Sequence, residues 1–150
     1  MFGEFPDKIE SLRDISEVQV IVEHVEKEYQ RVGFDPERYK VVVELKLRQL
    51  GISVAGGDGN AGLIGAAILY VNIHPMRASN SKYAVSISFF LIQAATVIQE
   101  GNAERVLATT WDDGALAVLE NHRISDLEDY LGRMVEAFAN DYLKVNDVNG

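Results

Sequence analysis

Apolar and polar residues alternate along two neighbouring stretches in the middle of the chain. In 66–74 and again in 83–91, one side of the alternation is apolar and the other carries mainly small, polar or aromatic residues. A period of two is typical of a β-strand with one face in a core. The connecting segment 76–82 is rich in turn formers, so the pattern predicts a hairpin over 65–97 around which the fold is organised.

Three further stretches are interpreted as strands. The β-branched run 18–25 alternates well enough to be the first strand, 52–55 is short, and 105–111 extends the hairpin into an antiparallel meander. The residues Asp112, Asp113 and Gly114 have turn chemistry and are expected to close that meander. The pattern over 115–123 fits either a short strand or a loop.

Two amphipathic helices are predicted from capping signals and apolar spacing. Asp35 is a good N-cap before Pro36, and Gly51 suits the left-handed position after the helix ends. The run 125–128 has capping-box spacing ahead of a second helix that continues to the C-terminal region. The apolar stripes Tyr39, Val43, Leu47 and Leu131, Met134, Phe138 are expected to cover Val20, Val71, Val85 and Ile87.

Together these elements predict one α+β domain over 1–150. It is a two-layer sandwich, in which a mixed sheet of four to five strands carries two main helices on one face, in the order β-α-β-β-β-β-α. Residues 1–17 are expected to form an N-terminal arm with a short helical stretch, and 147–150 to be a disordered tail. A chain of 150 residues can bury a full core without further cross-links.

The charge excludes one class of partner. The net charge is −9 and the sequence pI is about 4.7, whereas nucleic acids and anionic membranes require clustered Lys and Arg. No run approaches the roughly 18 apolar residues of a membrane span, and the first residues lack the features of a secretory signal. The chain has no cysteine, so neither disulfides nor thiolate chemistry is expected.

The residues that could carry chemistry do not assemble into a recognisable site. The glycine-rich run 56–62 is followed by a strand, which is the wrong context for a phosphate loop. The histidines His24, His74 and His122 are far apart in the sequence, although the first two lie near strand ends and can meet across a sheet. We therefore expect no metal, no cofactor and no catalytic residue.

The side of the sheet that faces away from the predicted helices carries no charge. Its expected residues contain no Lys, Arg, Asp or Glu, although a quarter of the chain is charged. Uncharged faces that keep aromatic and small polar residues are candidates for contact with another protein, and β-propensity alone also favours several of these residues. The predicted interaction face consists of Tyr70, Asn72, His74, Ala84, Ser86, Ser88 and Phe90.

The order of several short runs resembles a family of small bacterial proteins, many of them secreted. The runs are VELKLR at 43–48 before Gly51, LYVNI at 69–73, YAVSIS at 83–88, ATTW at 108–111 and FANDYL at 138–143. This resemblance implies an envelope-type α/β domain, similar in layout to the N-terminal domain of TolB and to small accessory lipoprotein domains. It implies contact with other proteins, a periplasmic or secreted location, and no catalytic residues. Without the resemblance, a cytoplasmic location is expected.

The leading hypothesis is a non-enzymatic interaction or assembly module. Such a module associates with itself or with a protein partner through the uncharged face or an exposed strand edge. One alternative is a small-molecule-binding protein with a pocket under the glycine-rich run, near His74, Trp111 and Asp112. Another is a hydrolase that uses His74 with Asp112 or Asp113.

Overall fold

The computed structural model describes residues 8–56 and 66–146. The predicted N-terminal residues 1–7, most of the glycine-rich run and the predicted tail 147–150 lie outside the described residues. The elements, in chain order, are η2 (Glu10–Leu12), β1 (Glu17–Val22), α1 (Lys27–Arg31), α2 (Pro36–Gln49), β2 (Ala66–Arg77), β3 (Lys82–Gln99), β4 (Asn102–Glu120), η3 (Asn121–Asp126) and α3 (Leu127–Val145).

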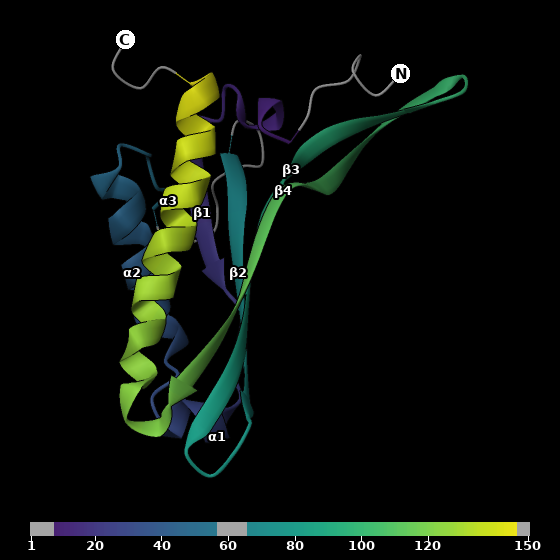
Figure 1. Ribbon diagram of the computed structural model, residues 1–150. Coiled ribbons are helices and arrows are strands. Elements are labelled where there is room, and N and C mark those ends of the chain that lie inside the picture. The colour runs from purple at the N-terminus through teal and green to yellow at the C-terminus, as the bar shows by residue number, and fades with distance from the viewer. Residues whose placement is uncertain (1–7, 57–65, 147–150) are drawn as a thin grey trace.

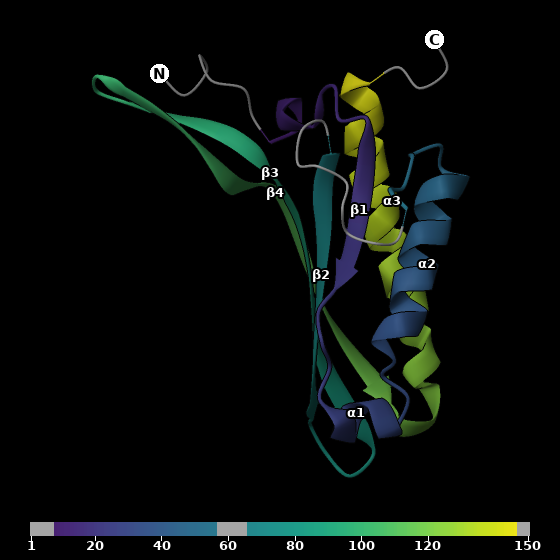
Figure 2. The same cartoon turned by 180° about the vertical axis from the view of Figure 1, so that it is seen from behind.

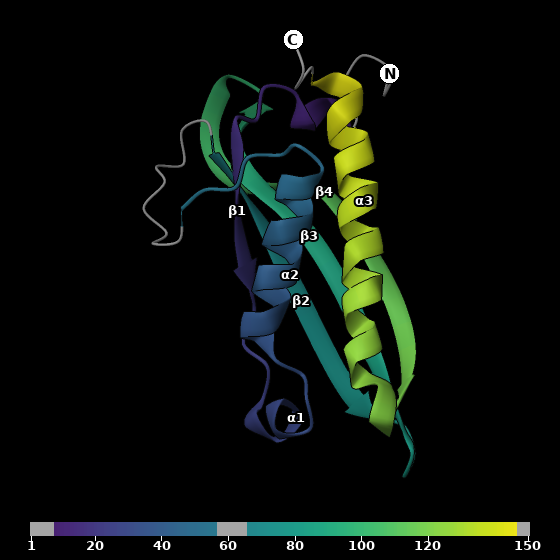
Figure 3. The ribbon, with the colours of Figure 1, turned by 90° about the vertical axis from the view of Figure 1, so that its left-hand side faces the viewer.

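The predicted α+β fold is confirmed. Four strands form one mixed sheet in the order β1-β2-β3-β4, in which β1 runs parallel to β2 and the remaining pairs are antiparallel. Both long helices, α2 and α3, lie side by side on one face of this sheet (Figure 1, Figure 3). Within residues 8–56 and 66–146, no long helix lies on the opposite face, as the reverse view in Figure 2 also shows.

Local sequence explains where α2 begins and ends. The Asp35 carboxylate accepts hydrogen bonds from the backbone N–H groups of Glu37 and Arg38 at 3.0 and 3.4 Å, as the predicted N-cap requires. Gly51 adopts a φ of 88°, the left-handed conformation that ends many helices. For α3 the predicted capping box is wrong, since the structure places Asp126 at the N-cap with a helical backbone and no side-chain cap bond.

The core lies between the helices and the covered face of the sheet. Along β3 every second side chain from Tyr83 to Leu91 is buried, in step with the predicted alternation. The predicted apolar residues of α2 and α3 are also buried, and they belong to the same core as these β3 side chains. Phe138 is fully buried and meets the Trp111 ring edge-on, with centroids 5.1 Å apart. Burial of this size supplies the main driving force for folding.

One local prediction about the strands is wrong, and one alternative that the sequence left open is decided. Asp112–Gly114 do not end the meander, because β4 continues through them and pairs with Ser88, Phe89 and Phe90 of β3. The ambiguous segment from 115 onward is strand as far as Glu120. Strand β3 pairs with β4 on both sides of Asp112–Gly114, and this pairing outweighs the local turn propensity of those three residues.

The predicted short strand at 52–55 is present only as a single parallel bridge. Val18 faces Val54 across the free edge of β1. The Val18 N–H donates to the Ser53 carbonyl and the Ala55 N–H donates to the Val18 carbonyl, both at 2.9 Å. This pairing gives the parallel direction that the strand-helix-strand order predicted.

The distal part of the β3–β4 hairpin extends beyond the sheet. We call residues 92–108 the arm; it rises past the end of β2 and bends away from the helices as a two-stranded ribbon (Figure 1, Figure 2). Strand β2 pairs with β3 only as far as Ile92, so no third strand among the described residues lies beside the arm. Its strands turn at Glu100 and Gly101, where the glycine has a φ of 74°.

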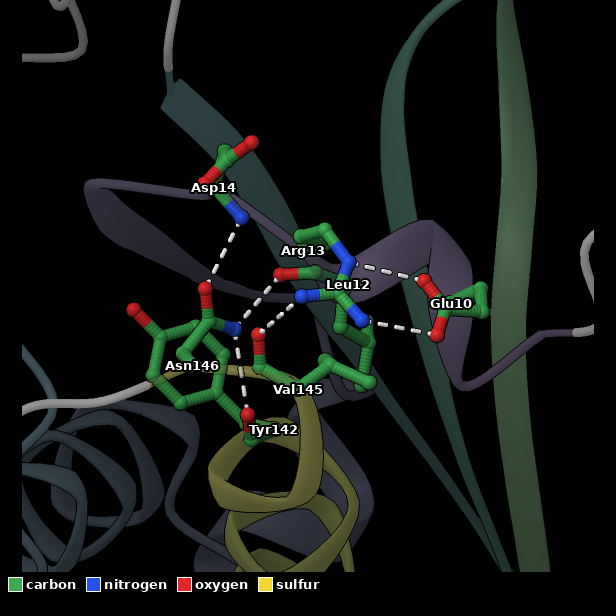
Figure 4. Close-up of polar contacts among 7 residues, drawn as sticks. All are labelled: Glu10, Leu12, Arg13, Asp14, Tyr142, Val145 and Asn146. Atoms are coloured by element: carbon green, nitrogen blue, oxygen red, sulfur yellow. Dashed lines mark hydrogen bonds and ion pairs between the residues drawn. The ribbon is translucent and has the colours of Figure 1, made fainter.

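The N-terminal segment is fastened to the C-terminal end of α3 (Figure 4). The Asn146 side chain accepts a hydrogen bond from the Asp14 N–H and donates one to the Leu12 carbonyl, each at 2.8 Å. Arg13 donates to the Val145 carbonyl at 3.2 Å. These contacts hold η2 across one end of the molecule, next to the base of the arm.

Candidate functional site

The face of the sheet opposite the helices is the main unpartnered surface of the described chain. We call it the open face. The strand register places the side chains of this face in rows that cross all four strands. The predicted interaction face contained only the residues on β2 and β3. The members of the open face are Ile21, Tyr70, Asn72, His74, Met76, Ala84, Ser86, Ser88, Phe90, Asp112, Gly114, Leu116 and Val118.

Large apolar side chains are exposed to solvent on this face. Leu116 is 71% exposed, Met76 is 66% exposed and Val118 is 59% exposed. Tyr70 and Phe90 are half-buried beside each other on neighbouring strands. Single exposed apolar residues are common in proteins, but apolar residues on adjacent strands of one face form a patch typical of protein contact surfaces.

Strand β4 adds the residues that the sequence interpretation missed. Leu116 pairs with Ser86, and Val118 pairs with Ala84. The signal was present, since Leu116, Val118 and Glu120 alternate with the buried Ala117 and Leu119, but the expected turn at 112–114 separated this segment from the sheet. The open face is therefore wider and more apolar than predicted.

Charged groups stand at the margins of the open face. Asp112 lies opposite Phe90 near the base of the arm, and Lys82 lies opposite Glu120 at the other end of the hairpin. Between these ends, the face carries no Lys, Arg, Asp or Glu on β2 or β3 among the described residues. An uncharged centre with charges around it is the usual composition of a protein interface.

At the β1 side, Glu23 adjoins the open face. Burial chiefly raises the pKa of the Tyr70 phenol, and a hydrogen bond with Glu23 and its negative charge raise it further. Asn72 is the next residue of β2 on this face. It is half-buried, and no described residue donates a hydrogen bond to its enclosed Oδ1. The open face at β2 therefore presents a neutral phenol and an amide, and neither group is arranged for acid-base chemistry.

His74 lies at the rim of a small cleft beside the open face. Glu23, His24, Val25 and Tyr29 also line this cleft, so the two histidines share one site, as their positions near strand ends suggested. Its volume is about 130 Å³. Pockets for small organic ligands usually measure about 300–1,000 Å³, and this cleft is therefore too small for a typical one.

The structure separates the residues of the predicted ligand pocket. Trp111 lies on the covered face, where its Nε1 donates to the Asp141 carboxylate at 2.9 Å. His74 and Asp112 both lie on the open face, but in different rows. His74 pairs with Ser86 of β3, whereas Asp112 pairs with Phe90, four residues further along β3. The glycine-rich run was expected to cover this pocket, and nearly all of it falls outside the described residues.

The predicted hydrolase residues are separated in the same way. Asp113 pairs with Phe89 on the covered side, whereas its neighbour Asp112 points to the open side, because successive strand residues alternate. Over the ranges 8–56 and 66–146, no three His, Asp or Glu side chains are grouped to hold a metal ion.

A second hollow lies between α2 and α3, on the outside of the helix layer. Its volume is about 550 Å³. Ion pairs join the two helices here, Arg38 to Glu128 at 3.1 Å and Lys46 to Glu136 at 2.8 Å. Because these charges of opposite sign already neutralise each other, the groove resembles a solvated helix seam more than a ligand site.

The arm carries apolar residues on both of its sides. Ile98 is 81% exposed and Leu107 is 56% exposed on the side that continues the open face, while Val97 and Val106 occupy the other side. Sequence reasoning ended one strand at 97 and began the next at 105, so it did not foresee a ribbon. The base of the arm is fixed by Gln93, which donates to the Ser11 carbonyl at 2.8 Å.

Within the part of the chain that the structure describes, no helix is long and apolar enough to cross a membrane. No family model matches the chain, and no curated protein matches it. One solved structure with a similar arrangement is the dodecamer of a PelC variant from Paraburkholderia phytofirmans. The two chains share 14% identity with a TM-score of 0.49, over 86% of this chain and 90% of that chain. A likeness of this size says nothing about what this chain binds.

Proposed function

We propose that this protein is a self-associating interaction module whose open face is covered by another protein surface, first of all a second copy of the same chain. One observation carries the proposal: in the described part of the chain the long helices cover one face of the sheet, and the other face exposes Leu116, Met76 and Val118 beside an uncharged centre. An antiparallel sheet with one face in water usually carries polar side chains there. This face departs from that pattern.

Covering the patch is favourable because apolar surface leaves water. Each Å² of apolar surface removed contributes about 25 cal/mol. Charged groups flank the patch: Asp112 forms an ion pair with Lys8 at 4.0 Å, and Lys82 lies opposite Glu120. They restrict which orientations of the partner are tolerated, since like charges placed against them are unfavourable.

The test is a change of mass in solution when one charge enters the centre of the face. Light scattering coupled to size-exclusion chromatography measures the mass of the native chain from micromolar to near-millimolar concentration. We expect more than one copy at high concentration. Leu116→Lys and Ser86→Lys should each raise the dissociation constant at least tenfold, because a buried lysine without a partner is strongly unfavourable.

A matched control is Val41→Lys on α2. Val41 is also an exposed apolar residue, but it lies on the helix layer. It should leave the dissociation constant unchanged, and circular dichroism should show all three variants folded. A native chain that is monomeric throughout, or face variants that associate as the control does, would overturn the proposal.

A further inference from the structure

Strand β4 forms one edge of the sheet, and the last part of this edge is open to pairing. Among the described residues β4 pairs only with β3, whereas β1 at the opposite edge is bridged by Val54. Residues 115–119 are alanine, leucine and valine alone, and in Figure 3 this end of β4 lies outside α3. Edge strands usually block pairing with other chains through lysines, prolines, bulges or covering segments. Among the residues that the structure describes, 115–119 have none of these protections.

Nearer the arm, the N-terminal segment covers the same edge. The Ser11 hydroxyl donates to the Thr110 carbonyl at 3.3 Å. The Lys8 amine donates to the Asp112 carbonyl at 3.1 Å. At the other end the strand gives way to η3. The open part of the edge is therefore 114–120, which we call the free edge.

The backbone presents alternate residues to the free edge. Along a strand, the N–H and C=O groups of successive residues point to opposite neighbours. The Asp112 carbonyl accepts its bond from outside the sheet, and two residues later the Gly114 N–H donates to the Asp113 carboxylate at 2.9 Å. Continuing this alternation, the N–H and C=O groups of Leu116 and Val118 point away from β3. A strand placed beside them can take up these groups.

We infer that two copies of the chain pair through their free edges, β4 against β4, antiparallel about a two-fold axis. The axis passes Ala117, which is the midpoint of 114–120. Leu116 of one copy then lies opposite Val118 of the other, and each such pair exchanges two backbone hydrogen bonds. The contact is isologous and closes on itself. It joins the two sheets into one, with the long helices of both copies on the same face.

Side chains favour this register over the neighbouring ones. With the axis at Ala117, the exposed Leu116 and Val118 side chains of both copies form one apolar cluster. Moving the axis to Leu116 places Glu120 of one copy opposite Asp112 of the other, and like charges directly opposite are destabilising. Moving it to Val118 places Leu116 opposite Glu120, so the apolar pair is lost. The axis at Ala117 avoids both penalties.

This contact goes beyond the proposed function, because it uses the edge of the sheet and not its face. The two open faces come to lie side by side and stay accessible to a further partner. In strand addition, main-chain hydrogen bonds supply the affinity and side chains select the register. We therefore expect a dimer that dissociates on dilution.

Amide hydrogen exchange, followed by NMR, gives a direct signature of the pairing. In the dilute monomer, the amides of Leu116 and Val118 should exchange about tenfold or more faster than those of Ala117 and Leu119, which face β3. At concentrations where light scattering finds a dimer, the fast pair should slow by about tenfold or more. Exchange rates that stay the same in the dimer would overturn the inference.

The chain has no cysteine, so cross-linking can test the register. Leu116→Cys with a mass tag and Val118→Cys without one are mixed and oxidised. Opposite residues of a hydrogen-bonded pair have Cα atoms about 5.5 Å apart, a distance that suits a disulfide. We expect the mixed disulfide to form faster than a disulfide between two copies of either variant. A control, Val41→Cys on α2, should not cross-link with either. Equal rates for all pairings would contradict the register.

Val118→Pro separates the free edge from the open face. Proline removes the outward N–H but keeps an apolar side chain on the open face, and edge strands tolerate it where the N–H faces solvent. We expect the dimer dissociation constant to rise about tenfold. The matched control Val118→Thr keeps the N–H and should change the constant much less. Circular dichroism checks that both variants fold.

Ser86→Lys changes the open face alone, because Ser86 lies on β3 and not at the edge. If Val118→Pro weakens the dimer and Ser86→Lys does not, the edge contact stands and the proposed function is wrong. If Ser86→Lys weakens the dimer and Val118→Pro does not, the open face associates and the edge inference is wrong. A native chain that stays monomeric at every concentration overturns both.

Discussion

The two faces of the sheet are built from the same strands but meet different demands. On β3 the neighbours Phe89 and Phe90 point in opposite directions, the first fully buried under the helices and the second half-exposed on the open face. Packing with α2 and α3 fixes the covered face residue by residue. Among the described residues no helix packs on the open face, and its apolar residues Leu116, Met76 and Val118 are exposed to solvent.

Substituting the two phenylalanines tests this comparison most strongly. Phe89→Ala should lower the free energy of unfolding by about 3–5 kcal/mol, because it removes a large buried side chain and leaves a cavity. Phe90→Ala should cost about 1 kcal/mol in dilute solution, since water already reaches that ring. Urea unfolding at low protein concentration measures both. Similar losses at the two positions would contradict the division between the faces.

The next largest effect concerns the junction between the N-terminal segment and α3. The buried Tyr142 hydroxyl donates to the Ile15 carbonyl at 2.6 Å, and Tyr142→Phe leaves that carbonyl without its donor. We expect a loss of about 1–1.5 kcal/mol in urea unfolding. An unchanged midpoint would show that this bond adds no stability.

The same tyrosine predicts a pH dependence. Burial raises the pKa of Tyr142 above that of a phenol in the unfolded chain. The folded state therefore favours the neutral form, its stabilisation is complete below about pH 10, and it is lost as the pH rises through the raised pKa. Thermal melting between pH 8 and 11 should fall less steeply for Tyr142→Phe than for the native chain.

Helix capping gives a smaller and sharper contrast. Asp35→Ala should destabilise by about 1 kcal/mol, because the carboxylate bonds two N–H groups at the start of α2. Ser125→Ala, at the capping position that the sequence suggested for α3, should change stability by less than about 0.5 kcal/mol, since no side chain caps that helix. Equal losses would mean that Ser125 does act as a cap.

The smallest expected effect lies on the arm. Ile98→Thr should alter the free energy of unfolding by less than about 0.5 kcal/mol, because the side chain is already in solvent. The same substitution on the covered face, Ile87→Thr, buries a hydroxyl in the core. It should lower the free energy of unfolding several times more than Ile98→Thr. A large loss from Ile98→Thr would mean that the arm folds back on its own chain.

Prediction from sequence succeeded where short-range rules suffice. The cap at Asp35, the left-handed Gly51 and the period of two in 83–91 each express local geometry, and the structure confirms them. It failed at Asp112–Gly114, where turn formers lie inside a strand. The pairing partner of that segment is more than twenty residues away, and no local window contains it.

The candidate site divides in the same way. Alternation alone assigned Tyr70, Asn72, His74, Ser86, Ser88 and Phe90 to one side of their strands, and the strand register agrees. The partnership of His74 with Trp111 was inferred without knowing which face each occupied, and the structure places them on opposite faces. The arm was not foreseen, since its residues alternate no differently from those of an ordinary strand.

The sequence by itself determined the periodicities of this protein: which residues share a face of a strand or a helix, and where α2 begins and ends. Those follow from bonds and steric limits within a few residues. The pattern also predicted that both long helices cover one face of the sheet, and the structure confirms it. Only the tertiary structure decided that β4 carries Leu116 and Val118 to the open face, and that the β3–β4 hairpin extends past the end of β2. These features depend on β2 ending at its pairing with Ile92 while β3 and β4 continue, and contacts over such sequence distances arise only when the whole chain packs.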